Sequence, residues 1–143
     1  MAIRFAYPVD LTTDPDGRVV ARIADLPGCV TDGTDRAEAM VEVADALEEA
    51  LADVIIRRQD IPLPSPARGR PMAVPGAVIA GKVALYLALR DSDMTNVALA
   101  ERLGMAESEV RRMLDPAHAT KIGRLEQALA AVGRRLVVTM EAA

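Results

Sequence analysis

The stretch 21-ARIADLPGCVTDGTDRAEAM-40 decides how the first half of the chain folds. An apolar alternation runs into it, Asp25–Gly28 interrupts that alternation, and a second short apolar segment ends at Gly33. Asp35 with Glu38 three residues later has the spacing of a capping box, which marks a helix start. The stretch therefore predicts strand, turn, strand and helix. It also holds Cys29, the one cysteine of the chain, so a nucleophile on a turn has to be considered.

The flanking residues extend this pattern in both directions. Residues 3–11 alternate as one strand, Asp16-Gly17 is a turn signal, and residues 18–24 complete a hairpin. The helix that starts after Asp35 keeps an apolar face as far as Ile55. The alternating prolines of residues 61–71 favour an extended path, and residues 72–74 predict one more short strand. Residues 1–74 therefore predict a β-β-β-α-β module, with a single layer of sheet under one helix.

The second half of the chain has a helical pattern. Pro75-Gly76 marks the boundary, so the domains are predicted as residues 1–74 and 75–143. Helices are expected over residues 78–90, 95–103, 107–114 and 121–132, with Thr95 and Thr120 as caps. Residues 134–140 alternate as a final strand. The predicted fold class is α+β, with an all-α second domain that ends in a short strand.

Composition narrows the class of protein. The 143 residues are 51% hydrophobic, which is enough for a core, but aromatic residues make up only 2%. No run is long enough to span a bilayer and the N-terminus lacks the apolar centre of a signal peptide. With one cysteine, no internal disulfide can form, and the whole pattern favours a cytoplasmic protein without a membrane partner.

Charge is unevenly distributed along the chain. Residues 1–74 carry 8 Lys/Arg against 13 Asp/Glu, whereas residues 111–135 carry 6 against 2. Two partners of opposite charge would explain this asymmetry, and two ordinary solvated surfaces would explain it as well.

Residues 95–114, TNVALAERLGMAESEVRRML, predict a helix-turn-helix. Ala100 is small where two helices would cross, and Gly104 supplies the turn between them. A plain helical hairpin is the alternative, and the excess of cations that follows favours DNA. The residues expected at bases or phosphates are Thr95, Asn96, Ala106, Glu107, Ser108, Glu109, Arg111, Arg112, Thr120 and Lys121.

Two features of this half allow more than one interpretation. Glu107 and Glu109 can complement the positive end of their own helix, accept a hydrogen bond from cytosine, or repel phosphate. The final strand, with Leu136, Val138 and Met140 on one face, can pair within the chain or with its own copy. The second possibility predicts a homodimer that reads palindromic half-sites, with a tetramer also possible.

Enzyme chemistry finds little support in the residues. Cys29 has no base, cation or helix N-terminus beside it in sequence, so it is expected to be a small apolar core residue. His118 alone cannot build a zinc site. The aspartates Asp10, Asp14, Asp16, Asp25 and Asp32 could hold magnesium for nuclease chemistry, but most lie in or beside turns. We expect no catalytic activity, no metal and no cofactor.

These residues together resemble the HicB-type antitoxins. The likeness is carried by Tyr7-Pro8, the turn at Gly17, Asp25 to Cys29, Gly33 and the helix start at Glu38-Ala39, and it extends through residues 61–66, 74–89 and 118–122. It implies a partial RNase H-like domain joined to a DNA-binding domain. It also implies a HicA-like toxin partner, a small basic RNA-cleaving protein, and repression of the operon that encodes the pair.

The leading hypothesis is therefore an antitoxin that also binds double-stranded operator DNA. The acidic first domain would bind the toxin, with Asp14, Asp16, Asp25 and Asp32 as candidate contacts. One alternative is a repressor without a toxin, whose first domain senses a small ligand. A second is an enzyme, either a Cys29 hydrolase or a metal nuclease.

Overall fold

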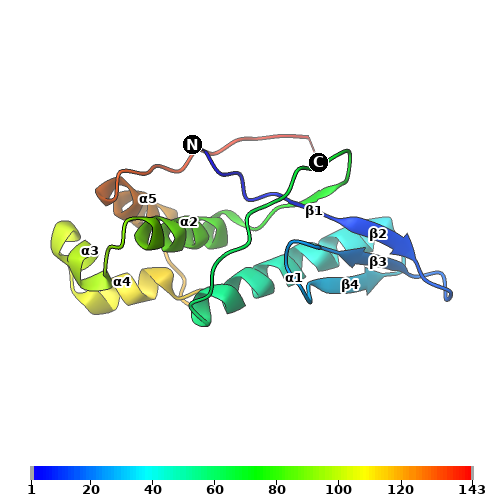
Figure 1. Cartoon of the computed structure of the whole chain (residues 1–143), viewed down its shortest axis with the longest axis horizontal. Helices are drawn as coiled ribbons and strands as arrows, with labels where there is room; N and C mark the ends of the chain where they lie inside the picture. The colour runs from blue at the N-terminus through cyan, green and yellow to red at the C-terminus, as the bar shows by residue number, and fades with distance from the viewer. Residues whose placement is uncertain (1, 143) are drawn as a thin grey trace. The chain divides into compact units, whose positions relative to one another are not determined.

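The computed structural model describes residues 2–142, which form two compact units (Figure 1). The chain passes from the first unit to the second between Ile79 and Ala80. The elements follow in the order β1 Tyr7–Pro8, β2 Asp10–Thr13, β3 Val19–Arg22, β4 Val30–Gly33, α1 Arg36–Ile56, β5 Met72–Ala73, α2 Ala77–Asp91, α3 Asn96–Leu103, α4 Glu107–Leu114 and α5 Ile122–Ala131. The predicted α+β class is confirmed. Within residues 2–142, no helix is both long and apolar enough to cross a membrane.

The first unit is a small antiparallel sheet covered by one long helix. Strands β2, β3 and β4 pair in that order, with Leu11 opposite Ala21 and Ala21 opposite Thr31. Helix α1 packs against β3, β4 and β5, and Figure 1 shows it running along the sheet. Its buried stripe has helical spacing and consists of Ala39, Val43, Leu47, Leu51 and Ile55. The predicted amphipathic helix is confirmed.

The junction between β4 and α1 is tightly packed. A Cβ built on Gly33 would lie 2.5 Å from the backbone nitrogen of Ala39, so only glycine lets the helix start so close to the strand. Asp35 caps the helix by accepting a hydrogen bond from the Glu38 N–H at 2.8 Å. The Glu38 carboxylate reaches back to the Thr34 hydroxyl, also at 2.8 Å. The predicted Asp35 cap is therefore present, but the Glu38 carboxylate returns to Thr34 and not to the N–H of the N-cap residue, as a standard capping box requires.

The first strand differs from its prediction. Residues 3–11 do not form one strand, because β1 pairs with β5 whereas β2 pairs with β3. The chain changes partner around Val9, whose N–H donates to the Pro71 carbonyl at 2.8 Å. Pro8 has no N–H to continue a ladder there. Alternation in sequence shows which face is apolar, but it does not show which strand is the neighbour.

The second unit is a helical bundle around one apolar core. Side chains from all four helices meet in it, including Leu85 of α2, Leu99 of α3, Val110 of α4 and Leu125 of α5. Helices α3 and α4 have the predicted limits within one residue. The expected final strand is wrong for the single chain, because residues 134–142 have no regular secondary structure. A strand needs a neighbour to pair with, and pairing with a second copy stays a prediction.

The proline-containing segment of residues 61–71 is held against the first unit by polar contacts. The buried Tyr7 donates its hydroxyl hydrogen to the Pro62 carbonyl at 2.8 Å. The Asp25 carboxylate accepts from the backbone N–H and the hydroxyl of Ser65, both at 3.0 Å. These contacts give the segment a defined path without regular secondary structure.

We predict that Tyr7→Phe lowers the free energy of unfolding by about 1 kcal/mol at neutral pH, because one buried hydrogen bond is lost. Burial, and secondarily the Asp25 carboxylate, raise the pKa of Tyr7 to about 12. The unfolded tyrosine has a pKa of about 10, so the wild-type chain loses stability as the pH rises from about 10 towards 12. The phenylalanine variant lacks this loss. Urea unfolding of both chains should show the difference narrowing above pH 10, and a constant difference up to pH 11 would contradict this account.

Candidate nucleic-acid interface

Helices α3 and α4 are joined by a tight turn whose geometry is set by local residues. The Thr95 hydroxyl accepts a hydrogen bond from the Ala98 N–H at 3.1 Å and caps α3 as predicted. Gly104 ends α3 in the left-handed conformation with φ of 65°, which costs glycine little. Leu99 and Val110 are fully buried between the helices. The two helices are therefore held in a single arrangement.

Helix α4 divides its residues between the core and the solvent. Val110 and Met113 are buried, and Arg111 and Arg112 are exposed. The Ala106 N-cap makes no side-chain hydrogen bond, and its carbonyl accepts from the Glu109 N–H at 3.0 Å, so no side chain caps the positive end of α4. A short helix with one apolar face and a cationic outer face is the kind of element that enters a DNA groove.

The two glutamates of α4 are both ion-paired. The Glu107 carboxylate lies 2.9 Å from Arg111 Nε, one helical turn away. The Glu109 carboxylate lies 3.0 Å from a terminal nitrogen of Arg124 on α5. Both glutamates also lie in the first turn, where a negative charge complements the helix dipole. The structure thus gives both residues an intramolecular role.

The remaining predicted interface residues are found at or near helix starts. Asn96 is the first residue of α3 and Ser108 the second residue of α4, and both are half-buried. Lys121 is the exposed N-cap of α5, with no side-chain capping bond. The expected cap at Thr120 is wrong, because its hydroxyl oxygen instead accepts a hydrogen bond from Lys82 at 2.8 Å.

Lys82 is the residue of this region that the sequence did not single out. It is fully buried, and its ammonium donates to the carbonyls of Arg112, Met113 and Asp115 at 3.2, 3.1 and 2.8 Å. Burial lowers the pKa of Lys82, and the nearby Asp115 carboxylate partly opposes this shift. One lysine in the apolar run of residues 77–89 was the available signal, because a buried cation needs several oxygen partners.

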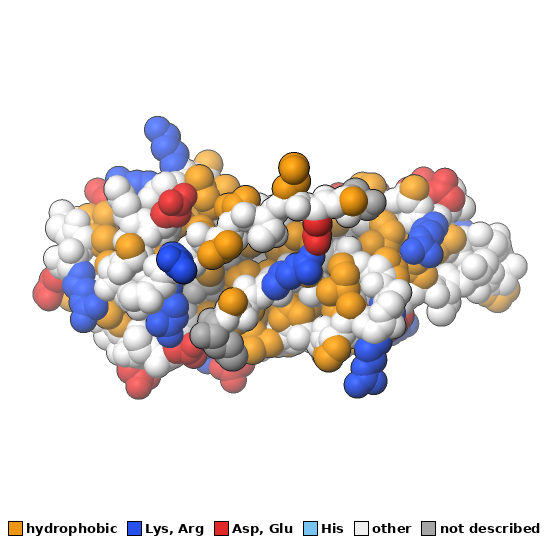
Figure 2. Space-filling model, turned by 90° about the horizontal axis from the view of Figure 1, so that it is seen from above, with side chains coloured by type: hydrophobic (Ala, Val, Ile, Leu, Met, Phe, Trp, Pro, Cys, Tyr) orange, Lys and Arg blue, Asp and Glu red, His pale blue; other side chains and the backbone are white. Residues whose placement is uncertain are grey.

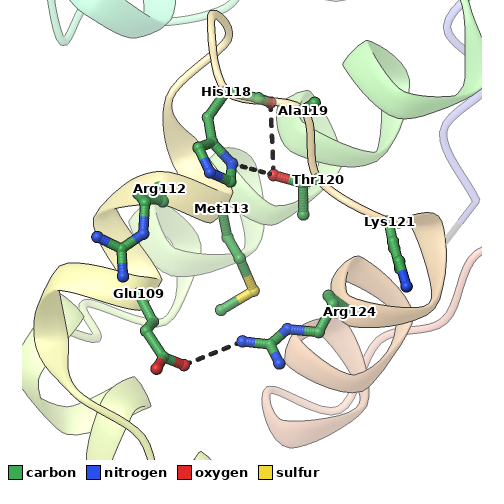
Figure 3. Close-up of a pocket in the computed structure, with 8 residues that line it drawn as sticks. All are labelled: Glu109, Arg112, Met113, His118, Ala119, Thr120, Lys121 and Arg124. Atoms are coloured by element: carbon green, nitrogen blue, oxygen red, sulfur yellow. Dashed lines mark hydrogen bonds and ion pairs between the residues drawn. The ribbon is translucent and has the colours of Figure 1, made fainter.

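A cavity of about 380 Å³ opens between α4, the loop of residues 115–121 and the start of α5 (Figure 3). Its lining includes Glu109, Arg112, Met113, His118, Lys121 and Arg124. Met113 lies between the polar side chains, and the Arg124 guanidinium points across the cavity towards Glu109 (Figure 3). Three permanent cations and one carboxylate surround this space, so it favours an anion.

The aspartates of the first unit do not converge. Asp14 accepts hydrogen bonds from the backbone N–H groups of Asp16 and Arg18, each at 2.9 Å, and so shapes the hairpin turn. Asp32 lies 2.9 Å from Arg18 Nε, and this bond lowers the pKa of Asp32. Asp16 is exposed. Within residues 2–142 no three His, Cys, Asp or Glu side chains are placed to hold a metal ion.

Cys29 packs inside the first unit. It lies directly before β4 and only 4% of it is exposed, and burial raises the pKa of its thiol. A raised pKa keeps the sulfur protonated at neutral pH, which opposes nucleophilic attack. The prediction of an apolar core residue is confirmed.

The C-terminal segment exposes apolar side chains. Leu136 packs against the core of the second unit, whereas Val138 and Met140 are 86% and 99% exposed. On the face shown in Figure 2, apolar side chains are visible between dispersed cations and anions.

Comparison with known proteins identifies the family. A family model described as "HicB_like antitoxin of bacterial toxin-antitoxin system" matches residues 6–87. Antitoxin HicB of Escherichia coli K12 is 38% identical over 94% of this chain and 98% of its own length. Antitoxin HicB 1 of Photorhabdus laumondii is 35% identical over 94% and 86%, and Antitoxin HicB of Pseudomonas fluorescens is 33% identical over 99% and 98%. The chain belongs to the HicB-like antitoxin family.

The family model matches a shorter stretch of the chain than the full-length relatives do. The family model includes the first unit and most of α2, but it ends before α3 and α4. The antitoxin relatives continue through nearly the whole chain, so the second unit is shared with them. The resemblance inferred from Tyr7 to Ala39 is therefore confirmed.

We predict that Lys82→Met lowers the stability of the second unit by about 2–4 kcal/mol, because three carbonyls and one hydroxyl lose their shared donor in a buried site. Lys121→Met removes the same charge from an exposed position and should change stability by about 0.5 kcal/mol or less. Chemical unfolding followed by circular dichroism compares the two variants. Equal, small effects of the two variants would show that the hydrogen bonds of Lys82 make no net contribution to the free energy of unfolding.

Proposed function

We propose that this chain is a cytoplasmic antitoxin that neutralises a HicA-like RNA-cleaving toxin and represses its own operon by binding operator DNA. Residues 1–74 are assigned to the toxin and residues 75–143 to DNA. The observation that carries the proposal is the similarity to proteins named Antitoxin HicB over 94% of the chain, covering both units. We propose a role in binding and regulation rather than catalysis.

The DNA-binding half of the proposal is supported by the α3–α4 pair. Its tight turn at Gly104, its buried contact at Leu99 and Val110 and its exposed Arg111 and Arg112 fit a helix-turn-helix whose second helix enters the major groove. Thr95 and Lys121 start the flanking helices, where backbone N–H groups commonly bind phosphate.

The toxin-binding half is supported by charge. Residues 1–74 carry five more acidic than basic residues, so they would attract a basic partner and speed the encounter at low salt. Among the four candidate aspartates, Asp16 is exposed and makes no ion pair within residues 2–142, so it is the best placed to meet a partner. Asp14 and Asp25 already serve turn and loop geometry.

The homodimer is supported by the C-terminal segment. Val138 and Met140 alternate with Thr139 in the sequence and are exposed, so they leave apolar side chains that a second copy can cover, while Leu136 anchors the segment to the core of its own unit. Two copies related by a two-fold axis would place two α4 helices on successive half-sites of an operator.

We predict opposite effects from two charge-removing variants. Arg112→Gln should weaken operator binding by about tenfold, because a cation facing phosphate or a base is lost, and should leave toxin neutralisation unchanged. Asp16→Asn should weaken toxin binding and leave operator binding unchanged. Gel shift with DNA from upstream of the reading frame, and growth of cells co-expressing the neighbouring small basic protein, measure the two activities. Loss of neutralisation in Arg112→Gln would overturn the division of labour.

We predict that Val138→Asp converts a dimer to a monomer, because a charge replaces an apolar side chain in the proposed interface. Thr139→Asp adds the same charge on the opposite side of the segment and should leave the dimer intact. Both residues are exposed, so neither change should unfold the second unit. Analytical ultracentrifugation of the two variants and the wild-type chain measures their oligomeric state. A wild-type chain that is monomeric at micromolar concentration would refute the dimer itself.

A further inference from the structure

The cavity beside α5 has the parts of a preformed anion site (Figure 3). Arg112 and Lys121 line it, and within residues 2–142 neither side chain has an ion-pair partner. Lys121 is the N-cap of α5 and makes no side-chain capping bond, while its carbonyl accepts a hydrogen bond from the Arg124 N–H at 2.9 Å. Two cations without an ion-pair partner therefore lie at the edges of one cavity, one on α4 and one at the start of α5.

The wall of the cavity is held by Lys82 from inside the unit. Its ammonium binds the end of α4 through the Met113 carbonyl and the loop through the Asp115 carbonyl and the Thr120 hydroxyl. His118 Nδ1 lies 3.2 Å from the same hydroxyl. A loop fixed at several points loses little further entropy when an anion binds, which favours affinity.

Among the cations that line the cavity, Arg124 already has an ion-pair partner. The Glu109 carboxylate lies 3.0 Å from its guanidinium, with both side chains partly exposed. A carboxylate and a phosphate offer similar oxygen pairs to a guanidinium. Glu109 therefore holds the place that an incoming phosphate would take on Arg124.

We propose that this cavity seats one backbone phosphate of duplex DNA and that Glu109 is its intramolecular competitor, released from Arg124 when the phosphate enters. This inference rests on the proposed DNA binding and adds to it. Arg112 and Glu109 belong to α4 itself, so a strand bordering the groove that α4 enters would pass near the cavity. Because Glu109 has to leave Arg124 before a phosphate can bind there, non-specific binding to DNA is weaker than it would be with a free Arg124. Lys121 and Arg112 make the first contact with the DNA.

The test uses the full-length chain and a 30-base-pair duplex of random sequence, because backbone contacts do not depend on sequence. Fluorescence anisotropy over a series of KCl concentrations gives the affinity and the salt slope. Lys121→Gln should weaken binding about three- to tenfold and reduce the slope of log K against log salt by about 1. Arg36→Gln, which removes one exposed cation from α1 in the other unit, is the matched control and should change neither.

Glu109→Gln should act in the opposite direction and tighten binding about two- to fivefold, because Arg124 becomes available. Glu126→Gln removes the same charge from an exposed position on α5 that makes no ion pair within residues 2–142, so it controls for general repulsion. The gain from Glu109→Gln should disappear in an Arg124→Gln background, as a double-mutant cycle reveals. Thermal unfolding of each variant verifies that the second unit remains folded.

The outcomes separate the two levels of the proposal. If the wild-type chain binds no duplex even at low salt, the proposed DNA binding is wrong. If it binds, but Lys121→Gln behaves like Arg36→Gln, the cavity holds no phosphate and the DNA contact lies elsewhere. If Lys121→Gln weakens binding while Glu109→Gln matches Glu126→Gln, the phosphate seat stands and the competitor role of Glu109 is overturned.

Discussion

The buried ammonium of Lys82 joins α2 to the end of α4 and to the following loop of the second unit. Moving a charge out of water is costly, and it is tolerated here because carbonyl oxygens and the Thr120 hydroxyl surround the nitrogen. The carbonyls of Arg112 and Met113 belong to the last turn of α4, whose partial negative charge the ammonium offsets. One side chain from α2 therefore helps to fix both the end of α4 and the shape of the following loop.

Many charges in this chain serve local geometry before they are available to a partner. Asp14 shapes a turn, Asp25 holds Ser65, and Glu109 neutralises Arg124. A count of charges along the sequence does not distinguish such residues from Asp16 or Lys121. The three-dimensional pairing does, and it reduces a broad acidic half and a broad basic half to a few free groups. Those few groups are the ones that a partner can use without breaking an existing bond.

The sequence predicted the elements whose signals are local. The capping residues Asp35 and Thr95 and the glycine at 104 each act within four residues, so α1, α3 and α4 were placed nearly correctly. The failures involve distant partners. Residues 3–11 were read as one strand because alternation does not reveal that β1 pairs with a segment more than sixty residues away. Thr120 was assigned to a cap because nothing near it shows that Lys82, 38 residues earlier, takes its hydroxyl.

The net charge of the chain does not decide whether the candidate interface can bind DNA. The chain carries a net charge of −4, and DNA repels an acidic protein at long range. At physiological salt, however, charges separated by more than about 8 Å are largely screened, so the net charge of the whole chain says little about the potential at a bound phosphate. What matters is the charge within that distance, and the cavity beside α5 gathers Arg112, Lys121 and Arg124 against the single carboxylate of Glu109. An acidic chain can therefore bind DNA, provided that its cations are concentrated where the backbone passes and its carboxylates there can be displaced.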